Sequence, residues 1–167
     1  MGLTETGAQI LSNPLPPAER KIGSPGTGYG NEIAIADQNL NLLGPNIEGE
    51  ILVRGNNVMK EYLDRPEETR KTITEDGWLR TGDLGRMDED GFIFVTGRIK
   101  ELIIKGGENI APREIDEALL EHDAVLEAAA FARDCKDYGQ RVEACVRLKD
   151  GKTISEDALR DFCKERI

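Results

Sequence analysis

The sequence predicts an α+β fold in two parts: a small β-barrel-like or twisted sheet over residues 1–97, then a smaller α+β segment over residues 98–167. In the first part, short apolar runs rich in β-branched residues lie between turn residues, a pattern typical of strands. After Gly97, runs with helical spacing and runs with strand alternation follow one another. The chain is 38% hydrophobic, and at 167 residues it can bury a core without disulfides or metals.

Three strands and one helix are predicted in the first part. The strands cover the apolar runs 32–36, 49–54 and 91–95. The helix covers about 66–74, because Pro66 suits a first helical turn and the acids that follow it, Glu67 and Glu68, interact favourably with the helix dipole.

The second part is expected to begin with a hairpin that turns at Gly106 and Gly107, since two adjacent glycines readily adopt a tight turn. A helix over about 112–122 follows, because Pro112 precedes an apolar stripe with helical spacing.

Two strands and a last helix complete the second part. Residues 142–148 alternate apolar and polar side chains, as in a half-buried strand, and we expect 124–132 to pair with them. Ser155 then caps a helix. No glycine or proline stop signal follows this helix before Ile167, so we expect it to be truncated.

Charge and composition exclude several classes of protein. The net charge of −10 repels nucleic acid and anionic membranes. No apolar run approaches the roughly 20 residues of a spanning helix, and the first residues do not resemble a secretory signal, so we expect a cytoplasmic protein without a transmembrane segment. Three cysteines without CxxC spacing and the single His122 disfavour a zinc site or a hydrolase triad.

Four stretches combine glycine with hydroxyl or charged side chains: Gly2–Gly7, Thr81–Gly85, Gly97–Glu101 and Lys105–Asn109. Glycine lets a backbone approach a ligand closely, threonine can donate to a phosphate oxygen, and a carboxylate can hold a hard cation or accept from ribose hydroxyls. Together the four stretches indicate a nucleotide site.

In their order and with the residues around them, notably 76–84 and 97–110, these stretches resemble the adenylate-forming superfamily of acyl-CoA synthetases, luciferases and peptide-synthetase adenylation domains. The resemblance implies that residues 1–97 end a large AMP-binding domain and that 98–167 form most of a small, mobile C-terminal domain. It also implies an ATP-dependent acid–thiol ligase, as in fatty acid metabolism. Such a ligase forms an acyl-adenylate from a carboxylic acid, then an acyl-CoA thioester, and releases pyrophosphate and AMP.

The same resemblance assigns roles to four candidate nucleotide-binding residues. Thr4 matches the hydroxyl that contacts the phosphates of ATP, and Glu5 matches the carboxylate that holds Mg²⁺. Asp83 matches the ribose-binding aspartate, and Arg98 matches a second contact to the ribose.

Three further residues follow from the resemblance. Lys100, two positions after the arginine, matches the hinge about which the small domain turns between the half-reactions. Gly106 and Gly107 match the hairpin beside the pantetheine of coenzyme A, where a side chain would block the passage.

Two motifs of the family are expected to lie outside the chain: the phosphate loop before Met1 and the adenylation lysine after Ile167. The chain is therefore interpreted as a fragment that is inactive alone. The alternatives are an adenylation domain that loads a carrier-protein thiol and a non-catalytic binding module. The stretch Ser12–Pro16 also resembles oxalyl-CoA synthetases, so oxalate remains open beside fatty and aromatic acids, and the oligomeric state is open too.

Overall fold

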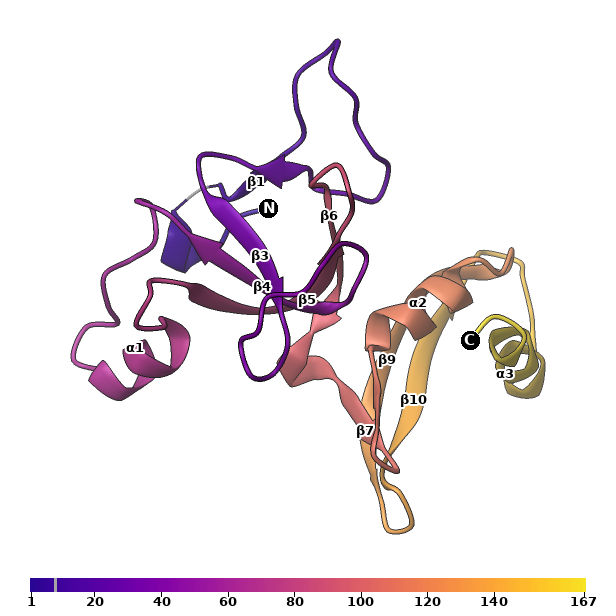
Figure 1. The fold of residues 1–167 in the computed structure, drawn as a ribbon. Helices are drawn as coiled ribbons and strands as arrows, with labels where there is room; N and C mark the ends of the chain where they lie inside the picture. The colour runs from indigo at the N-terminus through magenta and orange to yellow at the C-terminus, as the bar shows by residue number, and fades with distance from the viewer. Residues whose placement is uncertain (8) are drawn as a thin grey trace. The chain divides into compact units, whose positions relative to one another are not determined.

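The computed structural model describes residues 1–7 and 9–167, and these divide into two compact units, Met1–Val95 and Thr96–Ile167. Each unit has its own sheet, which gives the α+β fold that the sequence predicts (Figure 1). The assignment of 1–97 and 98–167 to two domains of an enzyme stays a prediction.

The first unit is built on a four-stranded sheet with the order β3-β4-β5-β6. Antiparallel pairing joins β3 to β4 and β4 to β5. The strands are β3 (Glu32–Ala36), β4 (Gly49–Arg54), β5 (Leu79–Met87) and β6 (Ile93–Arg98). A two-stranded ribbon, β1 (Leu11–Ser12) with β2 (Thr27–Gly28), the short 3-10 helix η1 (Thr4–Thr6) and α1 (Pro66–Thr72) complete the unit.

This sheet is open and not closed as a barrel, because β3 and β6 end the strand order. Of the two forms expected from the sequence, the structure therefore has the open sheet. The strand β5 was not predicted, and the three predicted strands and the helix at Pro66 are confirmed with small shifts at their ends.

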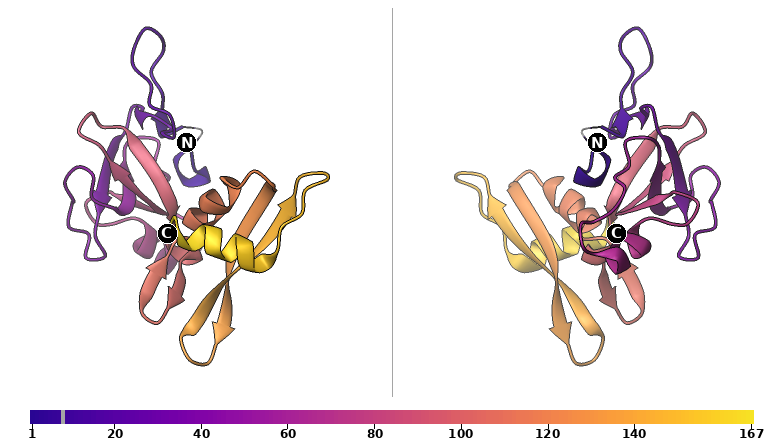
Figure 2. Two further views of the ribbon diagram at one scale, coloured as in Figure 1. Left: turned by 90° about the vertical axis from the view of Figure 1, so that its right-hand side faces the viewer. Right: turned by 90° about the vertical axis from the view of Figure 1, so that its left-hand side faces the viewer.

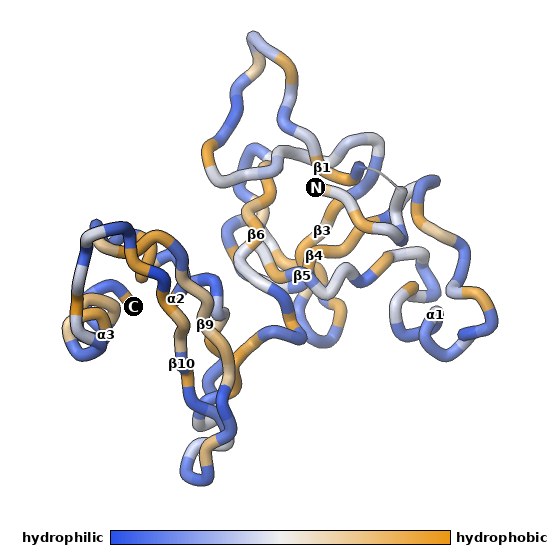
Figure 3. The backbone as a smooth tube through the Cα atoms, turned by 180° about the vertical axis from the view of Figure 1, so that it is seen from behind, coloured by the Kyte–Doolittle hydropathy of each residue, from blue (hydrophilic) through white to orange (hydrophobic). Residues whose placement is uncertain are grey.

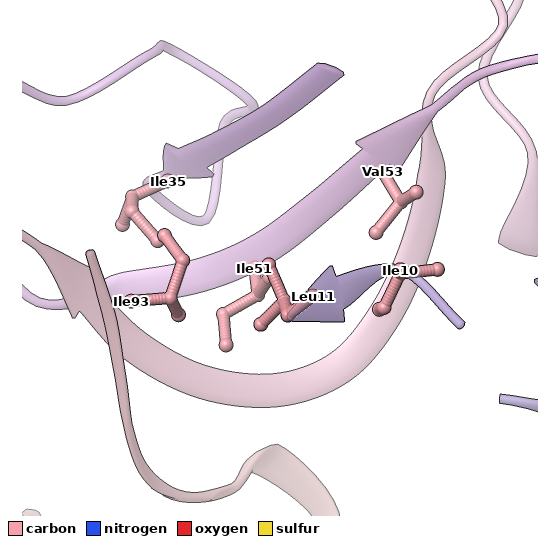
Figure 4. Packing of buried hydrophobic residues seen from close by; sticks show 6 residues of the cluster. All are labelled: Ile10, Leu11, Ile35, Ile51, Val53 and Ile93. Carbon is pink, nitrogen blue, oxygen red and sulfur yellow. The ribbon is translucent and has the colours of Figure 1, made fainter. Parts of the chain in front are cut away.

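The sheet of the first unit is buried on both faces. One face carries Ile35, Ile51 and Val53, which pack with Ile10, Leu11 and Ile93 (Figure 4). The other face carries a smaller cluster of Ala34, Ala36, Leu52 and Trp78. Two-sided burial explains why β4 reads as a continuous apolar run and does not alternate. In Figure 3, the tube is orange along β4 and mostly blue along α1, which has no buried residue.

The second unit contains a four-stranded sheet with the order β8-β7-β10-β9, in which all pairs are antiparallel. Its elements are the 3-10 helix η2 (Ile99–Glu101), β7 (Ile103–Lys105), β8 (Glu108–Ile110), α2 (Pro112–Leu120), β9 (Val125–Cys135), β10 (Gly139–Leu148) and α3 (Glu156–Lys164). Figure 2 shows β9 and β10 as a long hairpin whose turn points away from α2 and α3.

Local rules explain the helices of this unit. Ser155 caps α3 by accepting from the backbone of Ala158 at 3.2 Å, as predicted. α2 packs along β9, and Asp116 of α2 accepts from the backbone N–H of Ala130 at 2.5 Å. In the described part of the chain, no helix has the length and apolar character needed to cross a bilayer.

Candidate functional site

Thr4 and Glu5 lie in η1, a turn held by the buried side chain of Thr6. The hydroxyl of Thr6 donates to the carbonyl of Leu3 at 3.1 Å and accepts from its N–H at 3.2 Å. Thr4 is exposed beside it. The turn therefore fixes the backbone of Glu5 and leaves Thr4 accessible to a ligand.

The carboxylate of Glu5 is held by Tyr62, a residue to which the sequence analysis gave no role. The hydroxyl of Tyr62 donates to Oε1 of Glu5 at 2.9 Å. The backbone N–H of Met59 donates to the carbonyl of Glu5 at 2.7 Å. Tyr62 is anchored in turn, because its own N–H donates to Oγ1 of Thr69 in α1 at 3.0 Å. Burial, and next the hydrogen bond to Glu5, raise the pKa of the Tyr62 hydroxyl.

The residues around Glu5 fit a magnesium site of the kind completed by a nucleotide. Mg²⁺ is commonly bound by one or two carboxylates together with substrate phosphates, and not by a full cage of protein ligands. Among the described residues, no group of three or more His, Cys, Asp or Glu side chains could hold a metal by itself. A single oriented carboxylate next to the exposed Thr4 is consistent with that mode of binding, and this role of Glu5 stays a prediction.

Asp83 lies in a bulge of β5 and is 3% exposed. Glu50 of β4 pairs with Leu84, and Leu52 pairs with Arg80, so Ile51 alone faces the three residues Thr81–Asp83. The hydroxyl of Thr81 donates to the carbonyl of Ile51 at 2.7 Å and accepts from the N–H of Asp83 at 3.0 Å. Bulges re-aim side chains and are frequent beside active sites. The bulge thus sets the direction of the predicted ribose-binding carboxylate.

Arg98 and Lys100 lie where the chain enters the second unit. Arg98 is the last residue of β6, and Lys100 lies in η2, where the N–H of Leu102 donates to the carbonyl of Ile99 at 3.4 Å. Both residues are exposed. Lys100 is therefore part of a short helical turn and not of a regular strand. Its role as a hinge stays a prediction.

Gly106 and Gly107 form the two-residue turn of the β7–β8 hairpin, in which Lys105 pairs with Glu108. Their φ angles are 59° and 92°, as a turn with two left-handed central residues requires. The N–H of Gly106 also donates to the carbonyl of Tyr138 at 2.9 Å, so this turn adjoins the tip of the β9–β10 hairpin. The backbone alone thus favours glycine at both positions, and their predicted role beside coenzyme A is an additional constraint.

The structure thus places the predicted residues in separate local settings. In the first unit, Glu5 is grouped with Tyr62, and Asp83 with Thr81 and the residues of the bulge. In the second unit, Lys100 and the Gly106–Gly107 turn flank β7.

Two family models match the chain. Residues 1–63 match the AMP-binding enzyme model, and residues 114–167 match the model of the AMP-binding enzyme C-terminal domain. The chain belongs to the adenylate-forming AMP-binding enzymes. This confirms the family resemblance inferred from the sequence.

Curated relatives and solved structures in this AMP-binding family extend over the whole chain. The chain is 49% identical over 167 residues to the sulfoacetate–CoA ligase of Cupriavidus necator, covering 100% of the chain and 33% of the relative. It is 41% identical over 166 residues to the oxalate–CoA ligase of Saccharomyces cerevisiae, covering 99% of the chain and 31% of the relative.

A solved structure with the same fold is the o-succinylbenzoate CoA synthetase MenE of Bacillus subtilis in complex with the acyl-adenylate intermediate OSB-AMP. Its TM-score is 0.84 at 40% identity, over 99% of this chain and 34% of that chain. The chain therefore spans about a third of the length of the AMP-binding enzymes that it matches.

Proposed function

We propose that this chain is part of an AMP-forming CoA ligase, which activates a carboxylic acid with ATP and transfers the acyl group to coenzyme A. The observation that carries the proposal is that relatives named as CoA ligases, one of them solved with an acyl-adenylate, align with 99–100% of the chain. A cytoplasmic location, where ATP and coenzyme A are available, is part of the proposal.

In the first half-reaction, a carboxylate oxygen of the acid attacks the α-phosphorus of ATP, and pyrophosphate leaves. Asp83 accepts hydrogen bonds from the ribose hydroxyls and Arg98 adds a second ribose contact, so the nucleotide is oriented for this attack. Thr4 donates to a phosphate oxygen. Glu5 would hold Mg²⁺, which would supply positive charge next to the phosphate oxygens. Tyr62 keeps the Glu5 carboxylate in one direction through its 2.9 Å hydrogen bond.

In the second half-reaction, the thiol of coenzyme A loses its proton and its sulfur attacks the acyl carbon; the bond from this carbon to the phosphate oxygen breaks, and AMP leaves. Lys100, in the turn η2, is proposed to change its backbone conformation between the two half-reactions. The Gly106–Gly107 turn presents backbone without side chains, which leaves space for the pantetheine arm.

The acids named in the relatives guide the choice of substrate. Sulfoacetate and oxalate each carry a second acidic group beside the reacting carboxylate, and we propose a small dianionic acid of this kind. Pyrophosphate exchange by the whole protein that contains this chain is measured with sulfoacetate, oxalate, 2-succinylbenzoate and a fatty acid. Exchange with none of them, or with the fatty acid alone, in a protein that melts cooperatively, would contradict the proposal.

The role of Asp83 is tested in the same protein. Asp83→Ala removes the acceptor of the ribose hydroxyls. This should lower kcat/KM for ATP, which corresponds to a loss of about 1 to 3 kcal/mol of transition-state stabilisation. Asp150→Ala, at an exposed loop position of the second unit, is the control and should leave ATP kinetics unchanged. Equal ATP kinetics of the two variants would show that Asp83 serves only the bulge.

A further inference from the structure

The bulge in β5 is held by Glu50, a β4 residue to which no role has been assigned so far. Its carboxylate is buried, with 5% of the residue exposed. One oxygen, Oε1, accepts from the backbone N–H of Gly82 at 3.0 Å. The other, Oε2, accepts from Nε and Nη2 of Arg80 at 2.9 and 2.8 Å. Glu50 therefore binds the residue before the bulge and the residue at its centre.

The burial of the Glu50 carboxylate at this position of β4 needs a physical explanation. The next three residues of β4, Ile51, Leu52 and Val53, are 0 to 1% exposed and belong to the core. A charge buried beside them is unfavourable unless it is paired and hydrogen-bonded. Arg80 supplies one partner, and the second is available because Gly82, with φ of 72°, turns its N–H toward β4. The carboxylate and the bulge thus depend on each other.

We propose that Glu50 is a positioning residue for the nucleotide: it fixes the bulge at Gly82 and thereby holds Asp83 in the direction in which it accepts the ribose hydroxyls. Thr81 acts in parallel, because its hydroxyl ties the N–H of Asp83 to the carbonyl of Ile51. This inference rests on the proposed function, which assigns the ribose to Asp83.

Glu50→Gln is the direct test, because it keeps the shape of the side chain and removes its charge. The amide oxygen can still accept from Gly82, but the amide NH2 group then faces the donors of Arg80. The first unit offers a matched control in the pair of Glu32 on β3 with Arg54 on β4. There Nε and Nη2 of Arg54 donate to the carboxylate at 3.1 and 2.6 Å, and the Glu32 side chain is 62% exposed. Glu32→Gln breaks a similar pair on the same sheet, outside the bulge.

Titration calorimetry measures the binding of AMP and of 2′-deoxy-AMP to the whole protein. The ratio of the two Kd values reports recognition of the ribose hydroxyl, and a purely structural role of Glu50 would leave this ratio unchanged in the folded protein. We expect Glu50→Gln to lower the preference for AMP at least about fivefold, toward that of Asp83→Asn. Glu32→Gln should keep the wild-type ratio.

Two further variants keep the test decisive. Arg80→Lys retains the charge but loses the two-pronged geometry, so it should lower the ratio in the same direction and replaces Glu50→Gln if that variant does not fold. In an Asp83→Asn background, Glu50→Gln should cause no further fall, since Glu50 acts through Asp83.

The outcomes distinguish a failure of the proposed function from a failure of the role proposed for Glu50. A wild-type protein that does not bind AMP overturns the proposed function and this inference with it. A wild-type protein that binds both nucleotides equally overturns the ribose role of Asp83 and, with it, this inference. A wild-type protein that prefers AMP, with an unchanged ratio in the folded Glu50→Gln and Arg80→Lys variants, overturns the inference alone. An additive fall in the double variant also overturns it.

Discussion

Replacing Tyr62 by phenylalanine removes a single hydroxyl, the one that donates to Glu5 at 2.9 Å. Hydrogen bonds to charged groups contribute about 1.5 to 3 kcal/mol to stability. Both residues are half-buried, so water replaces part of the lost interaction in the variant. We therefore expect Tyr62→Phe to lower the free energy of unfolding by about 1.5 kcal/mol at pH 7, at the lower end of that range.

The dependence of this loss on pH follows from the raised pKa of Tyr62, caused first by burial and then by the Glu5 hydrogen bond. In the unfolded chain the hydroxyl ionises near pH 10, and in the folded chain it stays protonated to higher pH. Its stabilising contribution is therefore complete below about pH 10 and is lost as the pH rises through the folded-state pKa.

Urea unfolding of wild type and Tyr62→Phe at pH 7, 9 and above 10 measures this difference. The matched control is Tyr29→Phe, since Tyr29 is 62% exposed, and this variant should differ from wild type by less than about 0.5 kcal/mol. Equal stability of wild type and Tyr62→Phe at pH 7, or a difference that grows above pH 10, would contradict a stabilising hydrogen bond from Tyr62 to Glu5.

Three further predictions concern the hinge, the hairpin turn and an ion pair. Lys100→Pro disfavours the helical backbone of the preceding residue and therefore η2. In the whole protein, pyrophosphate exchange and thioester formation should then fall unequally. Equal losses in a folded variant would count against Lys100 as the hinge. A Cβ added at Gly107 or at Gly44 would meet no atom within 4 Å, but only Gly107 has a positive φ, 92°. Gly107→Ala should therefore destabilise the chain by about 1 to 2 kcal/mol in urea unfolding, and Gly44→Ala should cost less. Equal effects of the two substitutions would contradict the requirement for glycine in the turn. The hydrogen bond from Lys21 lowers the pKa of Asp88. The stability that this pair adds is therefore present above the ordinary pKa of aspartate and is lost on acidification. Lys21→Met should remove this acid dependence, which would appear as a smaller drop in Tm between pH 5 and pH 3.

The elements that could be predicted are those whose signals are local. Ser155 lies three residues before the N–H that it caps, and two adjacent glycines are sufficient to define the turn between β7 and β8. The alternation along 142–148 likewise reports its own strand. In each case the deciding signal lies within a short stretch of the sequence.

The features that could not be predicted depend on contacts between distant residues. Tyr62 and Glu5 are 57 positions apart, and no periodicity connects them. The strand β5 was missed because the bulge at Thr81–Asp83 breaks its alternation, and that bulge is stabilised by Glu50, some 30 residues earlier. The family resemblance identified Asp83 as a candidate ribose contact, but only the structure shows how its position is set.

The hydrogen bond between Asp116 and Ala130 lies at one edge of the second sheet. Within the described part of the chain, β9 pairs with β10 alone, so its other side is an open edge eleven residues long. Open edges offer free amides to strands of other molecules and are common starting points of aggregation. Here the Asp116 carboxylate occupies one of these amides at 2.5 Å and places a negative charge beside the edge. An incoming strand would lose that hydrogen bond and meet this charge at Ala130, so α2 disfavours strand pairing at this point of the edge.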